Sequence, residues 1–315
     1  MRYQIFLFHF MSPASVRSEK LVCSEKFELK YQNEEEKTRL KPTGDEDVPG
    51  VFRKADDQMI DEIIQAAQEA GSILLDAQSS AEVSRKSMHE LVTTADLLSE
   101  QYLRTRLLEI EPKAGFLGEE SWEGEFPAPP FWIVDPLDGT NNYAHGYPVW
   151  AVSIAYWNGS DVEYGCVHDP GRNETFSASI GSGAWMNGHR IVSTGVEEIS
   201  DCIFATGFPY HRKINDPGMD LDVLRYFLER VQGIRRGGSA ALDLAYVACG
   251  RLDGFWEEHL KPWDMAAGFL LAVESGGKVS SYKGEEWSPA SGGVIASGAP
   301  IHRTMLQGII HRKNR

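Results

Sequence analysis

Two carboxylates, Asp135 and Asp138, follow an apolar run of four residues and stand three positions apart. The run predicts a short buried strand that ends at the first acid. Because Pro136 fixes one φ angle and Gly139 permits a tight turn, both carboxylates can point into one small volume. Leu137 can bury its side chain and offer its backbone carbonyl to the same volume. Carboxylates this close repel unless a hard cation lies between them, and an all-oxygen donor set suits Mg²⁺.

The backbone N–H groups from Gly139 to Asn141 form a helix start or an amide nest, and either attracts phosphate. A cation site beside an anion cradle indicates phosphoryl chemistry. The same motif also suits an ordinary turn, in which Asp135 caps the turn and Asp138 reverses the chain with Gly139. These residues alone do not choose between the two interpretations, so the remaining carboxylates of the chain decide.

The composition is that of a soluble globular protein with a packed core, since 42% of the 315 residues are hydrophobic and 24% are charged. A net charge of −15 argues against binding to nucleic acid or to a membrane surface, because these polyanions would repel the chain. The four cysteines lie far apart, which indicates neither a zinc site nor a disulfide framework and favours a reducing compartment.

Residues 1–55 predict a poorly ordered extension, because stretches such as 34–37 and 41–47 have the composition of a solvated linker. The apolar run 5–10 is too short to span a bilayer, and no small-residue cleavage site follows it. Early basic and hydroxyl residues suit a transit peptide, but acids follow too soon for a typical one. We therefore expect a cytoplasmic protein, with organelle targeting by this extension as the alternative.

Regular apolar spacing begins at residue 60. Residues 60–75 predict an amphipathic helix, and a second helix begins near Asp96 and stops before Pro112. Further strands are expected at 115–120, where two acids end the strand, and at 149–156, 162–168, 174–179, 202–206 and 255–258. Further helices are expected at 220–231, 240–249 and 265–274. This alternation predicts an α/β or α+β layered sandwich. We expect an N-terminal half at 56–198 with the metal-binding motifs, and a C-terminal half at 199–315 that completes the active site.

Three further acids stand where such a site would need them. Asp96 and Asp264 each lie at the start of an expected helix, and Glu119 ends a strand beside Glu120. Each has an ordinary explanation, because acids cap helix N-termini and double acids are common in soluble loops. Only their occurrence together separates a site from these ordinary roles.

Taken in order, these residues resemble the inositol monophosphatase family, within the lithium-sensitive, magnesium-dependent phosphatases that include fructose bisphosphatases. The resemblance rests on residues 118–121 (GEES), 132–140 (WIVDPLDGT), 263–268 (WDMAAG) and 274–277 (ESGG), with weaker support from 91–96 and 207–210. It covers about residues 56–310 and leaves the first 55 without a counterpart. It implies an αβαβα sandwich that usually pairs as a homodimer.

The resemblance also implies two to three Mg²⁺ ions in each site. Glu119, Asp135 and the Leu137 carbonyl would hold the first ion. Asp135, Asp138 and Asp264 would hold the second, and Glu119 with water a third, weaker one.

Around these ions the resemblance implies roles for residues that touch water or substrate. Thr140 and Asp96 would orient or deprotonate the attacking water, so that with Glu119 they form the catalytic set. The residues expected to bind substrate or lie close to the metal cluster are Gly139, Thr140, Asn141, Ala240, Glu257 and Lys86. Asn141 departs from the second threonine usual in the family, and we expect activity to survive with altered substrate or metal affinity.

The expected reaction is hydrolysis of a small phosphate monoester by metal-activated water, with inositol monophosphate as substrate. Glu257 favours a polyol, because a carboxylate pairs naturally with adjacent hydroxyls. Histidinol phosphate, fructose 1,6-bisphosphate and NADP remain alternatives that the shared metal site does not separate. The alternative outside the enzymes is a regulatory binding protein that contacts the transcription machinery. The presence of all five carboxylates argues against it; these are Asp96, Glu119, Asp135, Asp138 and Asp264.

Overall fold

The computed structural model of the chain describes residues 58–85, 91–209 and 221–313. The extension predicted at 1–55 and the expected site residue Lys86 lie outside these ranges. Within them, no helix has both the length and the apolar character needed to cross a membrane.

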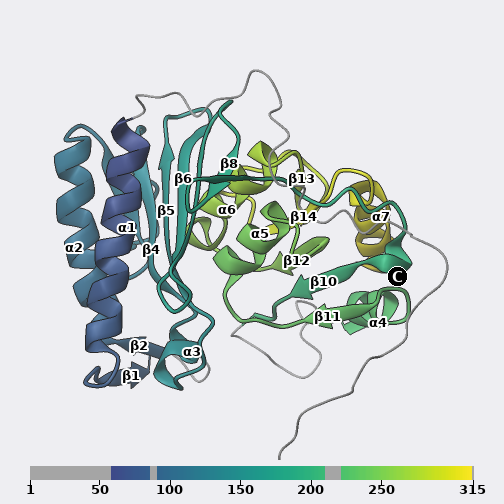
Figure 1. Cartoon of the computed structure of the whole chain (residues 1–315), viewed down its shortest axis with the longest axis horizontal. Coiled ribbons are helices and arrows are strands. Elements are labelled where there is room, and N and C mark those ends of the chain that lie inside the picture. The colour runs from purple at the N-terminus through teal and green to yellow at the C-terminus, as the bar shows by residue number, and fades with distance from the viewer. Residues whose placement is uncertain (1–57, 86–90, 210–220, 314–315) are drawn as a thin grey trace, which may run out of the picture. The chain divides into compact units, whose positions relative to one another are not determined.

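Two long helices pack on one face of a large sheet (Figure 1). The first, α1 (Gln58–Ala77), confirms the amphipathic helix predicted at 60–75, and its apolar residues at helical spacing, such as Ile63 and Leu74, are fully buried. The second, α2 (Thr94–Ile110), ends before Pro112 as predicted. A short hairpin of β1 (Val83–Arg85) and β2 (Leu91–Thr93) precedes α2.

The large sheet has seven strands in their sequence order. They are β3 (Gly115–Gly118), β4 (Phe131–Asp138), β5 (Ala151–Trp157), β6 (Val162–Asp169), β7 (Glu174–Ser179), β8 (Ala184–Met186) and β9 (His189–Ile191). Strands β3 and β4 are parallel and the others are antiparallel to their neighbours. The short helix α3 (Thr140–Ala144) directly follows β4.

The smaller sheet has five strands in the order β11-β10-β12-β14-β13. They are β10 (Ile203–Thr206), β11 (Gly233–Arg235), β12 (Gly254–Glu258), β13 (Lys278–Ser281) and β14 (Gly293–Ser297), and a 3-10 turn at Ile199–Asp201 precedes them. Strands β11, β10 and β12 are parallel, whereas β14 runs antiparallel to both of its neighbours.

Helices α5 (Ala240–Ala248) and α6 (Pro262–Glu274) lie between the two sheets, as Figure 1 shows. On the other face of the small sheet, α4 (Leu221–Leu228) and α7 (His302–Lys313) contact each other and complete the layers. The layer order is helix, sheet, helix, sheet, helix, which confirms the expected αβαβα sandwich.

Glycines allow close approaches in the middle helix layer. A Cβ added to Gly268 of α6 would lie 2.4 Å from the Leu244 Cβ of α5, so the two helices meet at backbone distance. A Cβ added to Gly165 of β6 would lie 3.0 Å from the Ala267 carbonyl oxygen of α6. Helix α6 also contacts β4, the strand that ends at Asp138.

The prediction that the strand ends at Asp135 is wrong. Strand β4 continues to Asp138, and its register with β5 shifts between these two residues. Asp135 pairs with Ser153 and Asp138 with Ala151, so one extra residue bulges from β4. Pro136 has no N–H to donate to the ladder, which accounts for the position of the bulge.

Candidate active site

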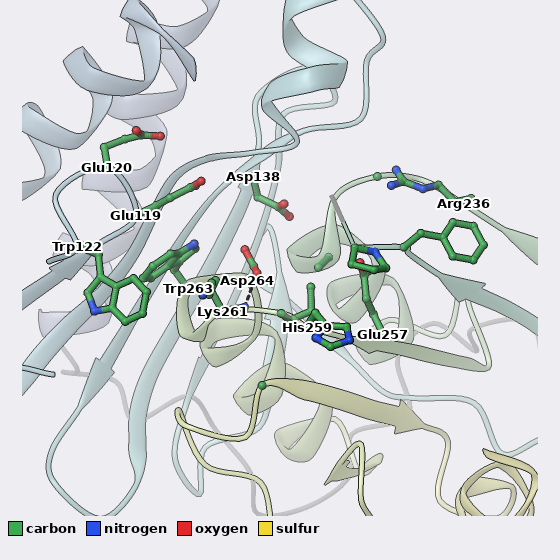
Figure 2. Close-up of a pocket in the computed structure, with 16 residues that line it drawn as sticks. Glu119, Glu120, Trp122, Asp138, Arg236, Glu257, His259, Lys261, Trp263 and Asp264 are labelled. Atoms are coloured by element: carbon green, nitrogen blue, oxygen red, sulfur yellow. Dashed lines mark hydrogen bonds between the residues drawn. The ribbon is translucent and has the colours of Figure 1, made fainter. Parts of the chain in front are cut away.

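Three carboxylates from two layers meet at one place. Asp135 and Asp138 come from the bulge of β4, and Asp264 comes from the first turn of α6. One oxygen of each lies within 4.8 Å of the others, a spacing that suits a shared metal ion. Figure 2 shows Asp138 and Asp264 facing the same opening, with Glu119 beside them. The structure thus brings together acids that are more than a hundred residues apart in the sequence.

The electrostatics of this cluster suit a cation site. Burial raises the pKa of Asp135 well above its usual value, and the charges of Glu119, Asp138 and Asp264 raise it further. Burial also raises the pKa of Asp264, again helped by its acidic neighbours. For Asp138, burial raises the pKa to about 6, although hydrogen bonds from the start of α5 oppose the shift. Buried oxygen donors that repel one another fit a hard divalent ion such as Mg²⁺.

Backbone donors hold one oxygen of each carboxylate in place. The Leu137 N–H donates to Asp135 Oδ1 at 3.0 Å, and the Lys261 N–H donates to Asp264 Oδ2 at 2.7 Å. Asp138 Oδ2 accepts from two groups at the start of α5, the Ser239 hydroxyl at 2.6 Å and the Ala241 N–H at 2.7 Å.

Thr140 and Asp96, predicted to act together, are in direct contact. Thr140 Oγ1 donates to Asp96 Oδ1 at 2.9 Å, and it also lies 3.0 Å from the Leu137 carbonyl oxygen. The other oxygen of Asp96 accepts from the Thr93 N–H at 2.8 Å and the Thr93 hydroxyl at 2.5 Å. The ordinary reading of Asp96 as an N-cap is wrong, because Thr93 is the N-cap and Asp96 is the third helical residue of a capping box.

Gly139 connects the acids to α3 in a conformation that other residues rarely adopt. Its φ is 96°, and a Cβ at this position would lie 2.9 Å from the Val149 carbonyl oxygen. Gly139 is the N-cap of α3, so the N–H groups of Gly139, Thr140 and Asn141 lie at a helix start, as predicted.

A cavity of about 770 Å³ opens over the acids. Glu119, Asp138 and Asp264 line it together with Ala240 and Glu257, two of the residues expected to bind substrate. In Figure 2, Glu119 and Trp122 lie to one side of the aspartates, and Arg236 and Glu257 lie to the other. One cavity therefore has an acidic centre and a separate wall on the side of α5 and β12.

Several residues at the site were not singled out by the sequence. Thr93 and Ser239 position Asp96 and Asp138, and both carry local signals, because each is a hydroxyl residue directly before a helix. Lys261 also lines the cavity, and its ammonium lies 4.9 Å from the centre of the Trp122 ring. Nothing local predicts that contact, because the two residues are far apart in the sequence.

The inositol monophosphatase family model matches residues 55–314. Inositol-1-monophosphatase from Mesorhizobium japonicum is 40% identical over 256 residues, which cover 80% of this chain and 96% of the relative. Nus factor SuhB from Pseudomonas aeruginosa is 38% identical over 261 residues, which cover 80% of this chain and 95% of that protein.

Solved structures show the same similarity. The extragenic suppressor protein suhB from Bartonella henselae superposes with a TM-score of 0.75 at 39% identity, over 80% of this chain and 98% of its own. Inositol monophosphatase from Anabaena superposes with a TM-score of 0.73 at 35% identity, over 81% of this chain and 96% of its own.

Proposed function

Because the chain belongs to the inositol monophosphatase family, we propose that it hydrolyses a phosphorylated polyol, with inositol monophosphate as its preferred substrate. The observation that carries this proposal is the meeting of Asp135, Asp138 and Asp264 within 4.8 Å, beside a cavity that Glu257 also lines. An acidic cluster alone would indicate only a cation site. The adjoining Asp96–Thr140 pair adds the proton acceptor that hydrolysis requires.

Glu119, Asp135, Asp138, Asp264 and the Leu137 carbonyl would hold two to three Mg²⁺ ions. The raised pKa of the buried aspartates supports this assignment, because a bound cation offsets both the cost of burying their charge and the mutual repulsion that adds to it. When bound, Mg²⁺ would acidify water and neutralise charge on the leaving oxygen of a phosphate ester.

The chain's own residues would position and deprotonate the attacking water. A water at Thr140 Oγ1 can pass its proton to the threonine while Thr140 passes its own to Asp96 Oδ1, 2.9 Å away. Thr93 holds the second oxygen of Asp96, so the acceptor keeps its direction. The N–H groups of Gly139 and Thr140 would orient the phosphate.

Recognition of the polyol would fall to the opposite wall of the cavity. Glu257 and Ala240 line it, and the Glu257 carboxylate can accept hydrogen bonds from adjacent hydroxyls. Asn141, in place of the family's second threonine, would donate its amide to phosphate or water near the acids and so adjust affinity without changing the reaction.

A regulatory binding role is the second candidate, because one relative with 38% identity is named Nus factor SuhB. Surface recognition of a partner does not need mutually repelling, buried carboxylates, whereas metal-dependent catalysis does. The acid cluster therefore favours the enzyme as the primary function.

The test is a phosphate-release assay on the full chain with inositol 1-phosphate, histidinol phosphate, fructose 1,6-bisphosphate and NADP. We expect the highest kcat/KM with inositol 1-phosphate in Mg²⁺, inhibition by Li⁺ and no release in EDTA. Absence of release from every substrate in Mg²⁺ would refute the enzyme assignment. A clear preference for another substrate would keep the phosphatase and refute the polyol assignment.

A further inference from the structure

One side chain beside the site, Asn142, joins two segments that are distant in the sequence. Asn142 lies on α3, and its Nδ2 donates to the Val149 carbonyl at 2.7 Å and to the Gly237 carbonyl at 3.0 Å. The Gly238 carbonyl lies 3.4 Å from the same nitrogen. This amide therefore ties the segment that follows Asp138 to the loop between β11 and α5.

The loop that Asn142 holds forms part of the cavity wall on the side of α5 and β12, which we call the substrate-side wall. Arg236, Gly238 and Ala240 all line the cavity. Gly238 has a φ of 90°, and a Cβ there would lie 2.4 Å from Arg236 Nη1 and 3.0 Å from Asn142 Nδ2. The guanidinium and the amide thus both pack against this glycine, so the path of the loop depends on the Asn142 side chain.

The acid side of the same loop has anchors of its own. Ser239 Oγ donates to Asp138 and also accepts from the Leu242 N–H at 3.3 Å, which caps α5. The Ala241 N–H makes a further bond to Asp138. Loss of the Asn142 amide would consequently displace residues 236–238 more than it displaces the groups that hold Asp138.

We propose that Asn142 is a positioning residue that fixes the distance between the acid centre and the substrate-side wall, and so sets recognition of the polyol part of the substrate. This inference rests on the proposed phosphatase function. It separates two properties of the site: the wall recognises the group that carries the phosphate, and the acids with Asp96 and Thr140 act on the phosphate itself. A phosphate ester without hydroxyls should therefore be insensitive to Asn142.

The experiment compares wild type and Asn142→Ala with inositol 1-phosphate and p-nitrophenyl phosphate, both in Mg²⁺. For inositol 1-phosphate we expect kcat/KM to fall about 10- to 100-fold, mainly through KM, because small misplacements of binding groups have effects of this size. For p-nitrophenyl phosphate we expect kcat/KM to stay within about 3-fold. Gly238→Ala disturbs the same contact from the loop side and should give the same split, which keeps the test available if Asn142→Ala does not fold.

Asn187→Ala is the matched control. Its amide donates to the Asn173 carbonyl at 3.0 Å and accepts from the Thr175 N–H at 2.8 Å in the turn between β8 and β9, outside the residues that line the cavity. Thermal unfolding reports the loss of stability of each variant, and we expect Asn187→Ala to keep the wild-type ratio between the two substrates.

Equal losses for both substrates in Asn142→Ala, or no loss for either, would overturn the positioning role. A folded wild-type protein that releases phosphate from neither substrate would overturn the proposed function instead. The two failures are therefore distinguishable.

Discussion

Asp138 combines two requirements in one carboxylate. Its Oδ2 is held by Ser239 and Ala241, and the group also lies in the cluster with Asp135 and Asp264. The hydrogen bonds alone could be accepted by an amide, whereas a cation site needs the charge. Substitution can therefore separate the structural role of this residue from its chemical one.

Asp138→Asn should lower kcat in Mg²⁺ by at least about 10³, the scale of a lost electrostatic contribution to the transition state. The variant should fold, because its amide oxygen can still accept from Ser239 and Ala241. In EDTA its Tm should equal or exceed that of wild type, since one repelling charge is gone. Steady-state kinetics and thermal unfolding check both expectations, and near-normal turnover would refute the site.

The metal-free protein should become more stable as the pH falls. The pKa of Asp138 is raised to about 6, so the folded chain binds this proton more tightly than the unfolded chain does. Its stabilising effect is complete below the unfolded pKa of about 3.9 and is lost as the pH rises through about 6. From about pH 7.5 to pH 5, Asp138 alone should add about 1 kcal/mol, and Asp135 and Asp264 act in the same direction.

Urea unfolding in EDTA at these two pH values measures this dependence. Added Mg²⁺ should stabilise the protein more at the higher pH, where the carboxylates are free of protons. A metal-free protein whose stability rises towards neutral pH would contradict the assignment of the cluster.

The residue types at the site were predictable where their chemistry is distinctive. Acids next to Pro136 and Gly139 suited either a cation site or an ordinary turn, and the structure favours the cation site because it brings Asp264 to them. Asn142 and Ser239 were not predicted, because their partners lie about a hundred residues away and short polar residues have many ordinary uses.

At the scale of the element, the start of α2 determines the direction of Asp96. Thr93 Oγ1 accepts from the N–H groups of Ala95 and Asp96 and also bonds the Asp96 carboxylate. The capping box therefore stabilises the helix and holds the proposed proton acceptor at the same time.

Thr93→Ala should lower the free energy of unfolding by about 1 kcal/mol, as expected for a lost N-cap, and lower kcat by about 10-fold because Asp96 loses an orienting partner. Thr93→Ser should restore both. Thr105→Ala is the matched control, because within the described part of the chain the Thr105 hydroxyl, on an exposed face of the same helix, bonds only to the Gln101 carbonyl. Chemical denaturation and steady-state kinetics provide the two measurements; a Thr93→Ala protein with reduced stability but wild-type kcat would limit Thr93 to capping.

Element boundaries near Pro136 show what local reasoning misses. Proline predicts the end of a strand, yet β4 resumes its pairing with β5 at Asp138. The continuation depends on a partner strand supplied by the fold, so it was not visible in the local sequence. The chain after residue 277 also gave no prediction for β13, β14 or α7, because its short, polar and glycine-rich segments lack a clear period.

At the scale of the whole molecule, the site depends on the separation of two sheets. The layer order followed from the alternation of strands and helices together with the family resemblance. The close approach of Gly268 to Leu244 could not be predicted in this way, because packing across the whole molecule decides which faces of two helices meet.

Gly268→Ala tests this close approach. Alanine usually stabilises a helix relative to glycine by up to about 1 kcal/mol, but here its Cβ would lie 2.4 Å from the Leu244 Cβ, which has no freedom to move away. We expect a net loss of about 1–2 kcal/mol in the free energy of unfolding and a lower kcat/KM, because α6 carries Asp264.

Gly195→Ala is the matched control, because a Cβ there has no heavy atom within 4 Å among the described residues and its φ needs no glycine. Urea unfolding and the inositol 1-phosphate assay compare the two variants. Wild-type stability and activity in Gly268→Ala would show that the layer can expand without affecting the site.

Apart from Ala240, the alanines of α5 and α6 lie outside the residues that line the cavity, yet their size sets how closely α6, which carries Asp264, packs against its neighbours. The radius of the cation that the proposed site would accept should therefore depend on the packing of these small interior residues as well as on the acids themselves. A variant that keeps every acid should therefore still bind a small cation more weakly if larger residues replace these interior alanines.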